Sequence, residues 1–288
     1  MTIRNPIEWS GAQLVSAAHA AERVHRSLHH ISETIHSPMP VTRRIGTQDV
    51  WRSLGQGAGD FEAYRSDVIF LCATYALVGL VIARLALGGN LLPLLFPLAS
   101  GFAIIGPLAA VGLYEMSRRR EQGASVSWIN AFDVLKAPAI GQIAVLGLVL
   151  IAVFLTWLGA AWLIFDHTLG PNIPTAPGPF LHSVFFTSAG RIMLVAGIAV
   201  GFCFALLAMM LSVVSFPLLV DRDVGLDTAI KTSFRAVIEN PKPMALWGAL
   251  VAAILALGTA FAFVGLMVAV PVLGHATWHL YRKLVVPA

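Results

Sequence analysis

Charge is scarce in this sequence. Only 12% of the 288 residues are charged and 57% are hydrophobic, whereas soluble domains carry about 25% charged residues. Apolar runs of about 20 residues in such a chain indicate membrane spans and not a soluble core. The net charge of +4 does not indicate nucleic-acid binding, because the Lys and Arg residues lie in short segments between apolar runs, where the positive-inside rule places them.

Cysteine and catalytic motifs are scarce as well. Cys72 and Cys203 are the only cysteines, both lie in apolar runs, and no CxxC pair accompanies them. The sequence therefore predicts no zinc or iron–sulfur site, and no other cofactor. It also has no Walker, HExxH, nucleophile-elbow or GxGxxG motif, so we expect a protein that is not an enzyme.

The first 40 residues differ from the rest. Residues 1–40 are polar and rich in histidine, and they contain no apolar stretch typical of a signal peptide. We expect a cytoplasmic tail that is partly helical or disordered, followed by an integral membrane domain over 41–288. His25 and His29 are one helical turn apart. This spacing leaves open metal capture beside the simpler interpretation of a solvated tail.

The membrane domain is predicted to cross the bilayer six times. A single span over Met244–Lys283 would place Arg282 and Lys283 on the outer side, whereas two spans keep every basic segment on one side. Pro107 and Pro271 support this count, because each precedes a basic cluster by eleven positions. The expected spans are 68–87, 91–116, 140–165, 192–220, 244–258 and 260–281.

An amphipathic helix is expected before each pair of spans. The first, over 41–67, has basic flanks, and Gly55, Gly57 and Gly59 indicate a break before Asp60. The fold is thus predicted to be all-α and polytopic, with three tandem transmembrane hairpins and both termini in the cytoplasm. The long segment Asp166–Gly190 has one charge, Asp166, and is expected to form an outer loop.

The other two amphipathic helices follow the second and fourth spans. Their apolar residues recur at helical spacing, and such a face packs on the bilayer or on the bundle, or it binds a partner. The residues singled out for these faces are Trp128, Phe132 and Leu135 in the first of the two helices, and Ile230, Phe234 and Val237 in the second.

Four polar residues at the spans are candidate ligand contacts. Arg84 lies within the first span, where it would contact a ligand or polar partner, or anchor to outer-leaflet phosphates. Glu115 lies at the end of the second span. His275 and His279 share a helix face, which leaves open metal, haem or lipid-headgroup binding beside an ordinary interfacial belt of aromatic and basic residues.

Several long stretches resemble a known family. RIGTQDVWRSLGQGAGDFEAYRSD (44–67), SVVSFPLLVDRDVG (212–225), ENPKPMALWG (239–248) and PVLGHATWHLYRK (271–283) are similar to the bacterial predicted integral membrane proteins of domain-of-unknown-function family 2189, as is the run ending at Arg120. The resemblance extends over about 41–286. It implies a location in the bacterial inner membrane, and it supplies neither an activity nor catalytic residues.

The leading functional hypothesis is a non-enzymatic accessory, assembly or scaffold protein. Its partners would be the lipid bilayer and other membrane proteins, or a second copy of itself. The proline-containing spans and the repeated hairpins leave open a small transporter or ion channel, with Arg84 and Glu115 as contacts. Haem or metal binding through His275 and His279 is a third alternative.

Overall fold

The fold is helical, as predicted. The structure, a computed structural model, describes residues 34, 37–88, 92–170, 176–260 and 263–287. Within these residues, the only β-type pairing is an isolated antiparallel bridge between Thr42 and Val285. The histidine-rich tail with His25 and His29 lies outside the described residues, so its metal-binding interpretation remains an expectation.

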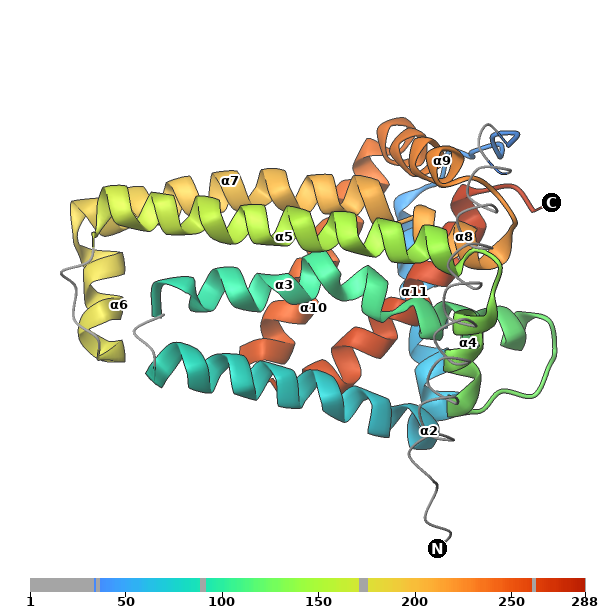
Figure 1. The fold of residues 1–288 in the computed structure, drawn as a ribbon, viewed down its shortest axis with the longest axis horizontal. Helices are drawn as coiled ribbons and strands as arrows, with labels where there is room; N and C mark the ends of the chain where they lie inside the picture. Colours follow the sequence, from blue (N-terminus) through green and yellow to red (C-terminus); the bar gives the residue numbers. More distant parts are fainter. Residues whose placement is uncertain (1–33, 35–36, 89–91, 171–175, 261–262, 288) are drawn as a thin grey trace, which may run out of the picture.

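Four stretches are long and apolar enough to cross a membrane, by length and composition. They are Leu92–Ala109, Ile140–Thr168, Ser188–Asp221 and Pro241–Ala260, and they coincide with four of the six predicted spans. Two of them form the helices α5 (Ile140–Thr168) and α7 (Ser188–Ser212), which lie side by side along the molecule's long axis (Figure 1). A chain with these helices is a multi-pass membrane protein.

The expected break before Asp60 is wrong. A single helix, α2 (Thr47–Gly88), passes through all three glycines and continues into the first predicted span. Gly57 has a packing role, because a Cβ added there would lie 2.4 Å from the backbone nitrogen of Ala276 in α11 (Leu266–Leu284). The glycine thus lets two helix backbones approach closely, and the intact helical hydrogen-bond ladder outweighs its poor helix propensity.

Two predicted spans are divided near their prolines. The second consists of a 3₁₀ turn, η1 (Leu92–Leu94), then α3 (Leu95–Ala109) and α4 (Val111–Glu121), with Pro107 in the last turn of α3. The fourth consists of α7 and α8 (Ser215–Asp221), with Pro217 in the first turn of α8. Proline cannot donate the helical hydrogen bond, so each helix ends or begins beside it.

The expected amphipathic helix after α4 is a 3₁₀ helix, η2 (Trp128–Lys136), and not an α-helix. Its side chains therefore repeat every three residues, which changes the composition of each face. The expected outer loop also contains a helix, α6 (Pro177–Phe186), which begins with a proline at a position that suits it.

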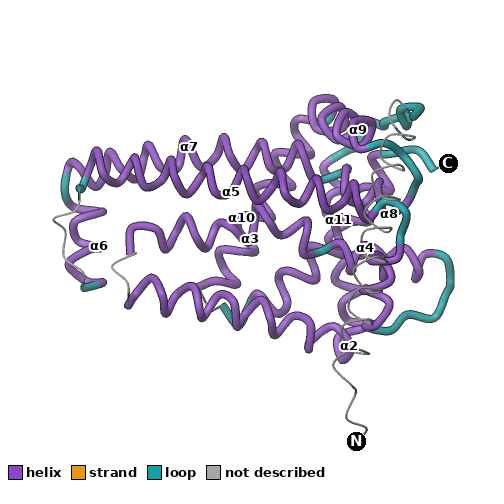
Figure 2. The backbone as a smooth tube through the Cα atoms, in the orientation of Figure 1, coloured by secondary structure: helices purple, strands orange, loops and turns teal. Residues whose placement is uncertain are grey.

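The polar elements gather at one end of the bundle. α4, α8, α9 (Leu226–Glu239) and the second half of α11 lie at this end, and α6 lies at the opposite end (Figure 1). Most of the loops lie at the same end as α4 (Figure 2). We call it the polar end. The bridge between Thr42 and Val285 brings the segment before α2 beside the segment after α11.

The last helix, α11, follows α10 (Pro241–Ala260) and packs against it. Both helices stop short of the bundle end that carries α6 (Figure 1). The second half of α11 packs at the polar end against α2 and α4, and Trp278 and Tyr281 there are fully buried. Large aromatic side chains thus fix the end of the chain to the bundle.

Candidate functional site

A buried aspartate connects three helices at the polar end. Asp60 of α2 accepts a hydrogen bond of 2.6 Å from the hydroxyl of Ser117 and one of 2.7 Å from Nη1 of Arg120, both on α4. On α11, Nε2 of His279 lies 2.9 Å from the same carboxylate. Nδ1 of His275 lies 2.8 Å from the Ser117 hydroxyl. We call these five residues the Asp60 cluster.

The protonation of His275 follows from its neighbours. The side chain is fully buried among the packed helices, with Nδ1 within hydrogen-bonding distance of the Ser117 hydroxyl. Because Ser117 gives its hydroxyl proton to Asp60, the Nδ1–H of His275 donates to the Ser117 oxygen. Nε2 is then an acceptor, and it has no hydrogen-bond partner among the described residues.

Asp60 remains charged in spite of its burial. Burial favours the neutral acid, but hydrogen bonds from His279 and Ser117 outweigh this effect, so the pKa of Asp60 lies below its ordinary value. The negative charge is neutralised locally by Arg120, which also donates to the carbonyl oxygen of Gly59. The cluster therefore connects α2, α4 and α11 through charged hydrogen bonds.

The combination of serine, histidine and aspartate differs from a nucleophilic triad. In a triad the carboxylate orients the histidine, which in turn activates the serine. Here Asp60 bonds to Ser117 itself, and among the described residues no hydrogen-bond partner orients His275 at its far nitrogen. Ser117 is also only 1% exposed. The geometry suits structural cross-linking of the helices, and it lacks the order of contacts that nucleophilic attack requires.

A cleft of about 520 Å³ opens beside the Asp60 cluster. We call it the α2–α4–α11 cleft, after the helices that line it. Glu121 on its wall accepts hydrogen bonds from Nε1 of Trp278 and from Nε of Arg282, each 3.0 Å long. Its charged and titratable lining consists of Asp60, Arg120, Glu121, His279, Arg282 and Lys283.

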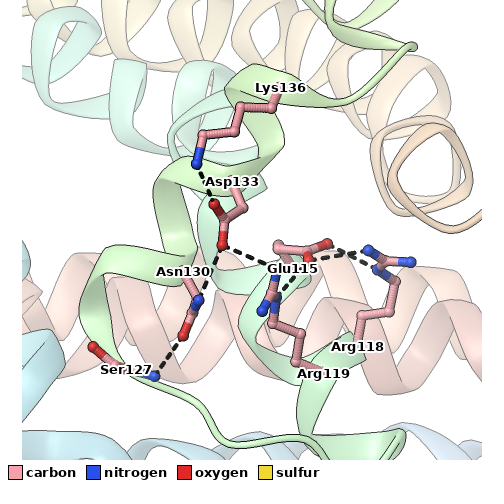
Figure 3. A network of polar contacts seen from close by, with 7 residues as sticks. All are labelled: Glu115, Arg118, Arg119, Ser127, Asn130, Asp133 and Lys136. Atoms are coloured by element: carbon pink, nitrogen blue, oxygen red, sulfur yellow. Dashed lines mark hydrogen bonds and ion pairs between the residues drawn. The ribbon is translucent and has the colours of Figure 1, made fainter.

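Glu115 belongs to a second polar network (Figure 3). Its side chain is 5% exposed and is held by Nε of Arg118 and Nε of Arg119, each at 2.8 Å. Arg119 also reaches Asp133 at 2.9 Å, and Lys136 binds the same carboxylate at 2.9 Å. This network lines a cleft of about 390 Å³ between α4, η2 and α8. Glu115 is thus engaged by arginines of its own helix.

η2 carries three distinct stripes because it has three residues per turn. Ala131 and Val134 are buried against the bundle. Asn130, Asp133 and Lys136 form the polar stripe, in which Asp133 accepts bonds of 2.9 Å from both neighbours (Figure 3). The third stripe is apolar and exposed: Ile129 is 59% exposed, Phe132 45% and Leu135 62%. We call it the η2 stripe.

Two of the three residues predicted for this face are exposed together. Phe132 and Leu135 share a row with Ile129, as an accessible face requires. The side chain of Trp128 lies outside the part of the chain that the structure describes. On α9, by contrast, Val237 is buried, and Ile230 and Phe234 pack against the core. Those three residues therefore pack against the helical bundle.

The structure brings together some of the predicted site residues and separates others. His275 and His279 both reach the Asp60 cluster. Arg84 is exposed near the other end of α2, away from the polar end (Figure 1). Across the described residues, no three His, Cys, Asp or Glu side chains are placed to hold one metal ion.

Sequence reasoning missed Asp60, Ser117 and Arg120 as partners of the two histidines. They come from helices that are far apart in the chain, so no local spacing connects them. The available signal was chemical: polar residues at the ends of apolar runs gather at one membrane surface when the runs pack antiparallel. That signal gives the side of the membrane but not the pairing.

The helices and the polar end define a class, that of multi-pass integral membrane proteins of unknown function. Over residues 95–221, the chain matches the model of the family described as predicted integral membrane protein (DUF2189), which confirms the resemblance seen in the sequence. The matched segment runs from α3 through α8 and is shorter than the resemblance over 41–286 suggested. No curated protein and no solved structure matches the chain.

Proposed function

We propose that this chain is a non-enzymatic accessory, assembly or scaffold protein of the bacterial inner membrane, and that it docks a membrane protein partner at its polar end. The η2 stripe is the observation that carries the proposal. It exposes three large apolar side chains in one row, beside the charged residues Asp133 and Lys136. An exposed apolar row with a polar border is typical of a binding surface.

The proposal places the polar end in the cytoplasm, with six crossings and both termini on that side. Arg120, Arg222 and Arg282 come from separate basic segments, and all of them take part in contacts at the polar end. The pairing of Thr42 with Val285 supports the same arrangement, since it holds the two ends of the membrane domain together. Basic residues concentrate on the cytoplasmic side of membrane proteins.

The η2 stripe belongs to a rigid element, which favours docking over random exposure. Ser127 caps η2 through a 2.9 Å bond from its backbone nitrogen to Asn130, and Arg119 ties Asp133 to α4. The stripe is therefore presented in a fixed geometry before a partner arrives. Preorganised surfaces bind with a smaller loss of conformational entropy.

Site-directed crosslinking tests this proposal. A photo-crosslinking amino acid at position 132, in cells followed by mild-detergent purification, should yield a discrete adduct with one membrane protein, identified by mass spectrometry. The double variant Ile129→Ser/Leu135→Ser should abolish it. Ile238→Ser is the matched control, because Ile238 is 66% exposed but stands alone among the large apolar residues of α9.

Two outcomes would overturn the docking role. One is a protein that is crosslinked to lipid alone and purifies as a lone monomer without a partner. The other is an adduct that survives in the double variant. The melting temperature of the double variant shows whether it is folded. Substitution of exposed residues by polar ones should change its stability by no more than about 0.5 kcal/mol.

A further inference from the structure

The α2–α4–α11 cleft combines converging cations with carboxylates that are already engaged. Arg120, Arg282 and Lys283 line it from two helices, together with Asp60 and Glu121, which pair with the two arginines. Asp60 accepts from Ser117 and Arg120 and is bound by His279, as described above. Glu121 accepts from Trp278 and Arg282. The acidic groups therefore have little remaining capacity to neutralise a further cation.

Lys283 is the cation that lacks a carboxylate. It lies half-buried on the cleft wall, and among the described residues it forms no ion pair. The lining holds three cations and two carboxylates. Arg282 also pairs with Asp221 outside the lining, at 3.3 Å, so Lys283 is the cation of this cleft without a counter-charge among the described residues. Partly desolvated ammonium groups are stabilised by an anion or by water, and a concave positive site concentrates anions.

We propose that the α2–α4–α11 cleft binds a phosphate group, with Lys283 and Arg282 as its principal contacts. Phosphate oxygens can accept two parallel hydrogen bonds from an arginine guanidinium, and they also attract the compact charge of a lysine ammonium group. A cleft of about 520 Å³ has room for a phospholipid headgroup. The polar end lies where apolar helices give way to charge, which is the depth of headgroup phosphates.

The same chemistry fits free phosphate or a lipid headgroup, and binding measurements separate them. Purified protein in mild detergent would be titrated with short-chain phosphatidylglycerol and, separately, with inorganic phosphate. Lys283→Gln removes the charge and keeps a polar side chain that is one atom shorter. Lys242→Gln is the matched control, since Lys242 is an exposed lysine at the start of α10. Lys283→Arg tests whether a cation suffices.

Lys283→Gln should weaken phosphatidylglycerol binding about tenfold, the loss expected for one charged hydrogen bond. Lys242→Gln and Lys283→Arg should bind like the wild type. Competition by inorganic phosphate would identify the phosphate group alone as sufficient, whereas lipid binding without competition would assign the site to a headgroup with its chains. Either result supports the phosphate site.

The proposal is overturned if Lys283→Gln binds as tightly as the wild type, or if Lys242→Gln loses affinity equally, which would mean general electrostatic attraction. It is also overturned if neither probe binds the wild-type protein. The melting temperatures of the variants establish that they fold. This site is separate from the η2 stripe, so either proposal can fail without the other.

Discussion

At the scale of single residues, the two histidines of α11 have different environments despite their shared helix face. His275 is fully buried and donates to Ser117, while His279 lies at the edge of the cleft against Asp60. The predicted pair is thus joined through Asp60 and Ser117, and each ring has one nitrogen engaged. A helical spacing of four residues gives a common direction, but it does not determine which atoms each ring meets.

Asn240 is a second residue whose side chain connects distant segments. It is 2% exposed, accepts a bond of 2.8 Å from the backbone nitrogen of Ile45, and donates to the carbonyl oxygens of Arg43 and Ala236. Asn240→Ala should cost roughly 2–3 kcal/mol, because it leaves buried backbone groups without partners.

Hydrogen exchange measured by mass spectrometry should show faster exchange at Ile45 in Asn240→Ala. The exchange rate at Ile45 in Asn240→Asp should lie between those of the wild type and Asn240→Ala. A carboxylate still accepts from Ile45 but cannot donate to the two carbonyl oxygens. Unchanged exchange in the alanine variant would show that this connection does not hold the segment.

At the scale of elements, the glycines of α2 show where sequence reasoning reached its limit. Helix propensity alone predicts a break at Gly55, Gly57 and Gly59, yet the helix is continuous. Packing against α11 decides the outcome at Gly57, and packing cannot be read from local sequence. The same limit applies to η2, where the 3₁₀ repeat adds Ile129 to the exposed row of Phe132 and Leu135.

Alanine substitutions at two of these glycines should have opposite effects. Gly57→Ala places a Cβ 2.4 Å from the Ala276 nitrogen, and the forced separation of the helices should cost roughly 1–3 kcal/mol. Gly55 has no atom within 4 Å of the added Cβ, so Gly55→Ala should stabilise the helix by up to about 1 kcal/mol. Paired thermal melts in one detergent measure both. Destabilisation by both substitutions would contradict a packing role specific to Gly57.

At the scale of the whole molecule, composition and charge predicted more than motifs did. The all-helical class and four of the six expected spans agree with the structure, because about 20 consecutive apolar residues have few alternatives to a membrane helix. The Asp60 cluster could not be predicted, because it depends on how α2, α4 and α11 are packed. Topology places its residues at one end, and only packing places them within hydrogen-bonding distance.

The proposed topology makes a prediction for labelling from either side of the membrane. With Cys72 and Cys203 replaced by alanine, single cysteines would be introduced at Gly178 in α6 and at Pro287 near the C-terminus, both exposed positions. Position 178 should react with a membrane-impermeant maleimide in intact spheroplasts, because α6 lies at the end of the bundle opposite the polar end (Figure 1), where the basic segments with Arg120, Arg222 and Arg282 meet. Position 287 should react only after permeabilisation, because the bridge between Thr42 and Val285 places the C-terminal segment at the polar end. Reaction of position 287 in intact spheroplasts would require either an odd number of crossings or an inverted bundle, and the behaviour of position 178 distinguishes these two cases.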